Sequence, residues 1–176
     1  MRTDPESTMY DDVLYPTDGS DGAEAALANA RDLAETYDAT VHVLYVAPRL
    51  TPHGLASDVE VVEGGGMIGD PEGGDGGMMA DRTRDDESQT AVRSQGMELV
   101  ESVANRLGDV RTRTEVRGGT PYEVILDYVD EHDVDLVLMG THGRTGLDRY
   151  LLGSVTEKVV RTADVPVLTV RGRAEA

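Results

Sequence analysis

Short apolar runs alternate with helix-spaced segments along this chain of 176 residues, and the alternation restricts its fold more than any other feature. Runs rich in β-branched and other apolar residues predict strands at 12–16, 40–46, 110–117, 135–139 and 165–170. Between them, apolar residues recur at the three- and four-residue spacing of helices with one buried face. This order predicts an α/β fold, an open five-stranded parallel sheet with right-handed crossovers and helices on both faces.

The charges on the predicted strands indicate their order in the sheet. The runs 12–16 and 135–139 have no charged face, whereas 110–117 places Arg and Glu side chains along one face. A strand with a charged face belongs at the edge of a sheet. The order 3-2-1-4-5 satisfies both observations. It places a topological switch between the first and fourth strands, where ligands bind beyond the strand ends.

Three helix starts carry capping signals. Asp21 and Glu24 have the spacing of a capping box, and 120–123 and 154–157 have the pattern with Thr or Ser first and Glu last. Pro121 stands at a first helical position, where its missing N–H costs nothing. The spacing in the last helix predicts that it buries Val155, Val159, Val160 and Ala163.

The composition divides the chain into one domain with short additions. We expect an extension over 1–8, a single domain over 9–172 and a tail over 173–176. Within the domain, residues 48–84 are rich in glycine and poor in periodic apolar positions. That composition predicts a long, variable and mobile insertion.

The net charge of −18 comes from 34 acidic against 16 basic residues, and the only Lys is Lys158. Acids spread along the whole chain, together with almost no Lys, are typical of a halophilic protein in a cytoplasm of molar salt, where charge repulsion is screened. An acidic tail or a disordered chain is the alternative, but the acids interleave with apolar periodicity. Nucleic acid is excluded as a partner because phosphate backbones require a basic face.

The chain has no Cys, which excludes disulfides, thiolate zinc sites and thiol nucleophiles. No window approaches the roughly 18 apolar residues of a membrane span, and no basic-then-apolar leader opens the sequence. The expectation is therefore a cytoplasmic protein without a membrane partner.

The most specific motif is a glycine pattern, G-x2-G-x9-G-S, formed by Gly140, Gly143, Gly153 and Ser154. Glycines let backbone amides approach phosphate oxygens, and the start of the last helix favours an anion. The pattern therefore indicates a polyphosphate lying across the switch point. A flexible loop followed by an ordinary capped helix is the alternative that the spacing alone leaves open.

Several segments together resemble the universal stress protein family, specifically its ATP-binding branch. The resemblance covers about residues 9–172 apart from the insertion. It is carried by 13–20, 43–46, 119–121, 135–144, 152–160 and 165–168. It implies a Rossmann-like fold of the adenine nucleotide alpha hydrolase type with an adenine nucleotide at the switch point. Proteins of this family usually begin where Met9 stands, so 1–8 is an extension or an upstream start.

The resemblance also implies the residues of the nucleotide site. Adenine and ribose would be contacted by Pro16, Thr17, Asp18 and the backbone of Val46. Ribose and the α-phosphate would lie against Met139 and Gly140. The phosphates would be held by Gly143, Arg144, Gly153, Ser154 and Val155. Capping roles for Asp18 and Ser154, and a solvated loop charge for Arg144, are the alternatives.

The function expected from this resemblance is nucleotide-dependent regulation in a stress response, with ATP bound together with Mg²⁺ or Mn²⁺. A P-loop motif is absent from the sequence, and His142 is the group in the glycine loop that titrates near neutral pH. Slow ATP hydrolysis or autophosphorylation is therefore a secondary interpretation. A further alternative is a dimeric subunit that binds a protein effector and uses nucleotide as a stabiliser. The apolar last strand, 165–170, predicts a homodimer.

Overall fold

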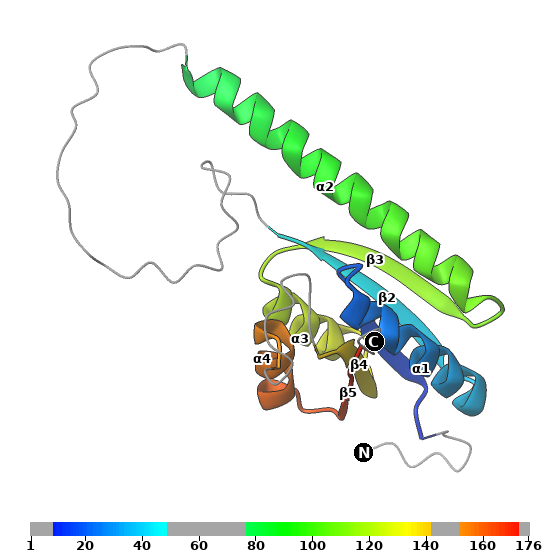
Figure 1. The fold of residues 1–176 in the computed structure, drawn as a ribbon. Coiled ribbons are helices and arrows are strands. Elements are labelled where there is room, and N and C mark those ends of the chain that lie inside the picture. Colours follow the sequence, from blue (N-terminus) through cyan, green and yellow to red (C-terminus); the bar gives the residue numbers. More distant parts are fainter. Residues whose placement is uncertain (1–8, 49–76, 142–151, 173–176) are drawn as a thin grey trace.

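The structure of the chain, a computed structural model, describes residues 9–48, 77–141 and 152–172 (Figure 1). Strands and helices alternate along these residues, as the sequence predicts. In chain order they are β1 (Asp12–Pro16), α1 (Asp21–Tyr37), β2 (Thr40–Ala47), α2 (Gly77–Leu107), β3 (Thr112–Gly118), α3 (Pro121–Glu131), β4 (Leu136–Gly140), α4 (Ser154–Thr162) and β5 (Val167–Val170).

The sheet is five-stranded and parallel, with the order β3-β2-β1-β4-β5, which confirms the predicted order. β1 pairs with β2 on one side and with β4 on the other. The topological switch point, where the order of strand addition reverses, therefore lies between β1 and β4. Every residue of β4 is buried. A central strand covered on both faces needs such a continuous apolar run.

Helices cover both faces of the sheet (Figure 1). Val13 and Tyr15 of β1 join a core formed with α1 and α2, whereas Leu14 joins the core formed with α3 and α4. Successive residues of a strand point to opposite faces, which is why one short strand contributes to two cores. The side chains of Val13, Leu14 and Tyr15 are fully buried.

The charged strand β3 lies at one edge of the sheet, as predicted. Val116 is buried in the core on the side covered by α2, whereas Arg113 is exposed. Arg117 lies on the opposite face from Val116 and pairs with Glu115 at 2.6 Å and with Glu131 of α3 at 2.7 Å. An edge strand can therefore carry arginines because one of its faces is reached by acidic partners and water.

Two helix starts differ from the predicted caps. The N-cap of α1 is Ser20 and not Asp21, and Ser20 Oγ accepts a hydrogen bond from Ala23 N at 3.3 Å. The N-cap of α4 is Gly153, so Ser154 is its first helical residue and the predicted capping box starting at Ser154 is wrong. Both errors are shifts of one residue, because a capping pattern fixes a helix start less sharply than the backbone dihedrals do.

Helix α3 keeps its predicted start but not the predicted hydrogen bonds. Thr120 is its N-cap and Pro121 follows directly, yet Thr120 makes no side-chain cap bond. The carboxylate of Glu123 instead accepts a hydrogen bond from the Tyr122 hydroxyl at 3.0 Å. A proline at the first position is therefore sufficient to mark this helix start.

Helix α2 begins at Gly77, inside the segment 48–84 that the composition predicted as an insertion. It ends at Leu107, and the following Gly108 has a φ of +70°, a left-handed conformation that commonly ends a helix. Its first half extends beyond the sheet in Figure 1. This half has no apolar period in its sequence, as expected for a helix segment that does not pack on the core.

In α4, the prediction that Val160 is buried is wrong, because its side chain is exposed. The buried residues of this helix are Thr156 and Val159, while Val155 and Ala163 pack at the margin of the core. Strand β5 is shorter than the predicted run and begins at Val167.

Candidate functional site

The turn after β1 is held by its own side chains. Gly19 N donates to Thr17 Oγ1 at 3.2 Å, and Ser20 N donates to Asp18 Oδ1 at 3.0 Å. Gly19 has a φ of +74°, a conformation that residues with a side chain rarely adopt. The Asp18 carboxylate thus braces the turn and does not cap α1, so the alternative of a cap at Asp18 is wrong.

A buried tyrosine fixes the start of α1 to this turn. The Tyr15 hydroxyl donates to the carbonyl of Ala23 at 2.7 Å. Burial raises the pKa of Tyr15 to about 12, so the hydroxyl remains a donor throughout the physiological range. The end of β1 and the first turn of α1 therefore form one rigid unit. Sequence reasoning missed Tyr15 because it reads as an ordinary core residue.

At the end of β4, Gly140 packs directly on α1. A Cβ placed on Gly140 would lie 2.3 Å from the carbonyl carbon and oxygen of Gly22 and 2.7 Å from Ala23 N. Met139, next to it, is buried against the α3–α4 core. The requirement for glycine at position 140 therefore has a packing cause, independent of any ligand.

The first turn of α4 is tied to the end of β4. Gly153 N donates to the carbonyl of Thr141 at 2.7 Å, and the hydroxyl of buried Thr156 donates to the carbonyl of Gly140 at 2.9 Å. Ser154 is exposed and Val155 is half-buried. The first N–H groups of a helix have no acceptor within the helix, so this turn offers amides and the positive end of a dipole beside the switch point.

Val46 lies at the carboxyl end of β2, beyond the last residue of β1. The register pairs Pro16 with Leu44, and Thr17 N donates to the Leu44 carbonyl at 2.9 Å. Alternate residues of a strand direct their backbone N–H and C=O groups to the same neighbouring strand. Val46, two residues after Leu44, therefore directs its backbone N–H and C=O groups toward the space beyond the end of β1. That space is bordered by the turn at Asp18.

The parallel register brings most of the predicted site residues together at the carboxyl ends of the strands. The residues that meet at this end of the sheet, or at the start of α4 beside it, are Pro16, Thr17, Asp18, Val46, Met139, Gly140, Gly153, Ser154 and Val155. Gly143, Arg144 and His142 lie outside the described residues. The sequence reasoning missed Thr156. Its signal was a polar residue three positions before Val159, on the buried stripe of α4.

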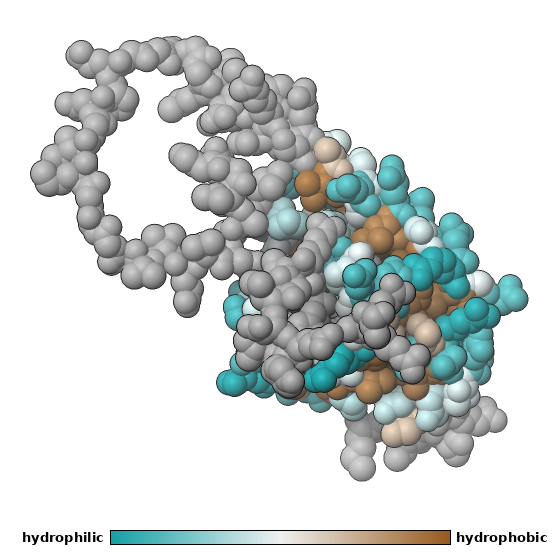
Figure 2. Space-filling model, viewed as in Figure 1, coloured by the Kyte–Doolittle hydropathy of each residue, from teal (hydrophilic) through white to brown (hydrophobic). Residues whose placement is uncertain are grey.

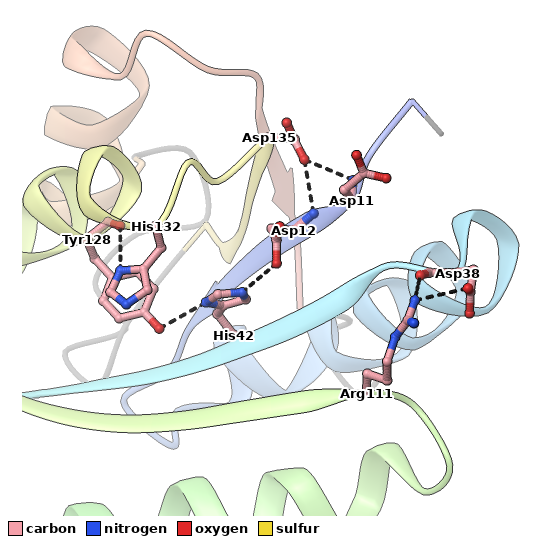
Figure 3. Close-up of polar contacts among 8 residues, drawn as sticks. All are labelled: Asp11, Asp12, Asp38, His42, Arg111, Tyr128, His132 and Asp135. Atoms are coloured by element: carbon pink, nitrogen blue, oxygen red, sulfur yellow. Dashed lines mark hydrogen bonds and ion pairs between the residues drawn. The ribbon is translucent and has the colours of Figure 1, made fainter. Parts of the chain in front are cut away.

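A second polar cluster lies at the opposite end of the sheet (Figure 3). His42 of β2 is fully buried, with Nε2 2.8 Å from Asp12 Oδ1 and Nδ1 3.0 Å from the Tyr128 hydroxyl. Burial lowers the pKa of His42, although the Asp12 carboxylate opposes this shift, and burial raises the pKa of Tyr128. The ring of His132 stacks on Tyr128 with centroids 4.0 Å apart. This cluster joins β1, β2 and α3 and is remote from the switch point.

The described residues contain no group of three or more His, Cys, Asp or Glu side chains arranged to hold a metal ion. None of the helices in the described part is both long and apolar enough to cross a membrane.

Lys158, the sole lysine of the chain, places Nζ 4.5 Å from the centroid of the Tyr122 ring and so links α4 to α3.

The model of the universal stress protein family matches residues 9–66 and 69–171. The chain belongs to the universal stress protein family. Universal stress protein MJ0531 of Methanocaldococcus jannaschii is 32% identical over 163 residues, which are 93% of this chain and 83% of that protein. The family assignment confirms the resemblance to the universal stress protein family as a whole.

Solved structures of the family have the same fold. That of MJ0577 from Methanocaldococcus jannaschii, 26% identical, aligns over 96% of this chain and 99% of its own with a TM-score of 0.72. Two more distant structures hold adenine nucleotides. One is a universal stress protein in complex with cAMP, 20% identical, covering 93% of this chain and 98% of its own, TM-score 0.52. The other is an Arabidopsis thaliana family protein with AMP bound, 19% identical, covering 93% of each, TM-score 0.54.

Proposed function

We propose that this protein binds ATP, with Mg²⁺ or Mn²⁺, at the switch point between β1 and β4, and acts as a nucleotide-dependent regulatory module in a stress response. The observation that carries the proposal is the first turn of α4, which is tied to the end of β4 beside the turn at Asp18. The AMP and cAMP in similar structures support an adenine nucleotide as the ligand class.

The described residues fit the parts of such a nucleotide. The exposed first turn of α4, from Ser154, offers backbone amides to phosphate. Asp18 carries a carboxylate that accepts hydrogen bonds from vicinal ribose hydroxyls. The backbone of Val46, beyond the end of β1, can pair with the edge of an adenine. Each contact uses a neutral or backbone group except that of Asp18, so binding requires no basic surface.

A divalent cation would be held mainly by the phosphates and by water. Mg²⁺ tends to retain several waters and to be bound through the phosphates of a nucleotide. The cation would neutralise part of the phosphate charge next to a protein of net charge −18.

Nucleotide binding can be tested by purifying the protein in molar KCl, identifying any co-purified nucleotide, and titrating ATP, ADP and AMP by calorimetry with Mg²⁺. The informative variant is Gly153→Val, because the N-cap φ of −58° and ψ of 146° suit any residue. We expect it to weaken ATP binding by about tenfold or more, since the side chain occupies the approach to the α4 amides.

The matched control is Thr162→Val, which changes an exposed residue at the far end of α4. It should bind ATP as the unmodified protein does. No binding of any adenine nucleotide by the unmodified protein would remove the proposal. Turnover within an hour would favour the secondary proposal of slow ATP hydrolysis or autophosphorylation over binding alone.

We also propose that the protein is a homodimer through its last strand, the run 165–170 that contains β5. β5 lies at the edge of the sheet, and its Leu168 is 40% exposed. An apolar edge strand is a template for pairing with another chain. Such a dimer could also present a surface to a protein effector.

A further inference from the structure

The hydroxyl of Thr156 is buried in the first turn of α4. The residue is 4% exposed, and its Oγ1 donates to the carbonyl of Gly140 at 2.9 Å. A threonine inside a helix ordinarily bonds a carbonyl of its own preceding turn. Here the bond crosses from the helix to the last residue of β4.

A second hydrogen bond lies beside the first. Gly153 N donates to the carbonyl of Thr141 at 2.7 Å, and Thr141 N donates to the carbonyl of Val170 in β5 at 2.9 Å. The start of α4 is thus joined to the strand ends at two successive residues of the β4 exit, Gly140 and Thr141. Of these two bonds, only the one from Thr156 uses a side chain.

We propose that Thr156 is a positioning residue for nucleotide phosphate: its hydroxyl holds the first turn of α4 against the end of β4. The inference rests on the proposed nucleotide binding. The amides of Ser154 and Val155 belong to that turn, and a helix terminus attracts an anion over only about one turn of distance. Small displacements of the turn therefore change phosphate binding strongly, while leaving the adenine and ribose contacts on β1 and β2 unchanged.

A purely structural role predicts a different outcome. If Thr156 only filled space beneath α4, its methyl group would matter and its hydroxyl would not. A positioning role predicts that the hydroxyl matters and that its loss is felt by phosphate alone. The pair Thr156→Ser, which keeps the hydroxyl, and Thr156→Ala, which removes it, separates the two roles.

The test is calorimetric titration of adenosine, AMP and ATP with Mg²⁺ in molar KCl, with folding verified by circular dichroism. We expect Thr156→Ala to bind ATP about tenfold more weakly than Thr156→Ser. Both variants should bind adenosine equally, because adenosine has no phosphate. If the alanine variant does not fold, Thr156→Val, which keeps the volume, takes its place.

Two outcomes would overturn the inference while leaving nucleotide binding intact. In one, the alanine and serine variants bind ATP equally; in the other, the alanine variant loses adenosine and ATP affinity to the same degree. Absence of ATP binding in the unmodified protein overturns the proposed function itself, so the two failures are distinguishable. Thr162→Val, on the exposed end of α4, is the control for removing a hydroxyl from this helix.

Discussion

At Gly140 the backbone of β4 lies against the first turn of α1, where an added Cβ would stand 2.3 Å from the carbonyl carbon and oxygen of Gly22. From the glycine motif, Gly140 is predicted to let its backbone come close to a phosphate. In the structure, its close contact is with the backbone of α1. A substitution here therefore disturbs the packing of β4 on α1 before it affects any ligand.

Gly140→Ala should lower the free energy of unfolding by about 1–3 kcal/mol, the usual cost of overpacking against groups that cannot move aside. Urea denaturation in molar KCl measures it. The control is Gly118→Ala, because a Cβ at Gly118 would meet only the Ala47 carbonyl oxygen at 3.9 Å. That control should change stability by less than about 0.5 kcal/mol. Equal stability of the two variants would contradict the packing argument.

The buried His42 makes stability depend on pH. Burial lowers its folded-state pKa below the ordinary value of 6.5. The unfolded chain therefore binds the proton more readily, and stability is lost as the pH falls from about 6.5 toward the folded pKa. The carboxylate of Asp12 favours the charged ring, while Arg113 and His132 oppose it.

The variant His42→Gln should remove this pH dependence between about pH 7 and pH 5.5. It should also lower the free energy of unfolding by about 1–3 kcal/mol near pH 7.5, because it disturbs buried hydrogen bonds to Asp12 and Tyr128. Urea midpoints at several pH values measure both effects. His132→Gln is the comparison variant, since it removes a neighbouring histidine but leaves the hydrogen bonds of His42 to Asp12 and Tyr128 in place. A His42→Gln variant with the pH slope of the unmodified protein would contradict the assignment.

Among the elements, β1 and β4 were predicted almost residue for residue, because their apolar runs are complete and they end in Pro16 and Gly140. Helix α2 was predicted too short, since its first half has no apolar face from which to infer a helix. Strand β5 was predicted too long, because Val165 continues the apolar run but lies outside the pairing with β4.

The edge element β5 is where the homodimer can be tested. Leu168→Asp places a charge on this strand and should convert a dimer to a monomer at micromolar concentration, because a charge opposes edge pairing. Size-exclusion chromatography with light scattering in molar KCl measures the mass. The matched control is Met97→Asp on α2, where Met97 is 41% exposed and Leu168 is 40% exposed. A monomeric unmodified protein would remove the dimer proposal.

At the scale of the whole molecule, acidic residues outnumber basic ones by 34 to 16. Figure 2 shows hydrophilic residues along the outer part of the described chain, with hydrophobic residues visible between them. Several ion pairs among the described residues are exposed. Such pairs contribute little individually, so the net charge of −18 is mainly a source of repulsion.

Lowering KCl from about 2 M to about 0.1 M should therefore destabilise the protein, since the Debye length grows from about 2 Å to about 10 Å. Thermal unfolding at each salt concentration measures the effect, and the midpoint should fall by several degrees or more. Replacing exposed acids, as in Asp32→Asn together with Glu101→Gln, should recover part of the loss at low salt. An unchanged midpoint across this range would contradict the halophilic interpretation.

The sequence by itself determined the alternation of elements, the strand order and the carboxyl end of the sheet as the place where most of the predicted site residues meet. These features follow from local apolar periods and from the charge of each strand, and both are properties of residues that are close together in the sequence. Only the tertiary structure decided that Gly140 packs on Gly22 and that Thr156 bonds the end of β4. It also decided that His42 is buried between Asp12 and Tyr128. Each of these contacts joins residues on different elements, and their distance apart is set by how helices dock on the sheet, which no local pattern records.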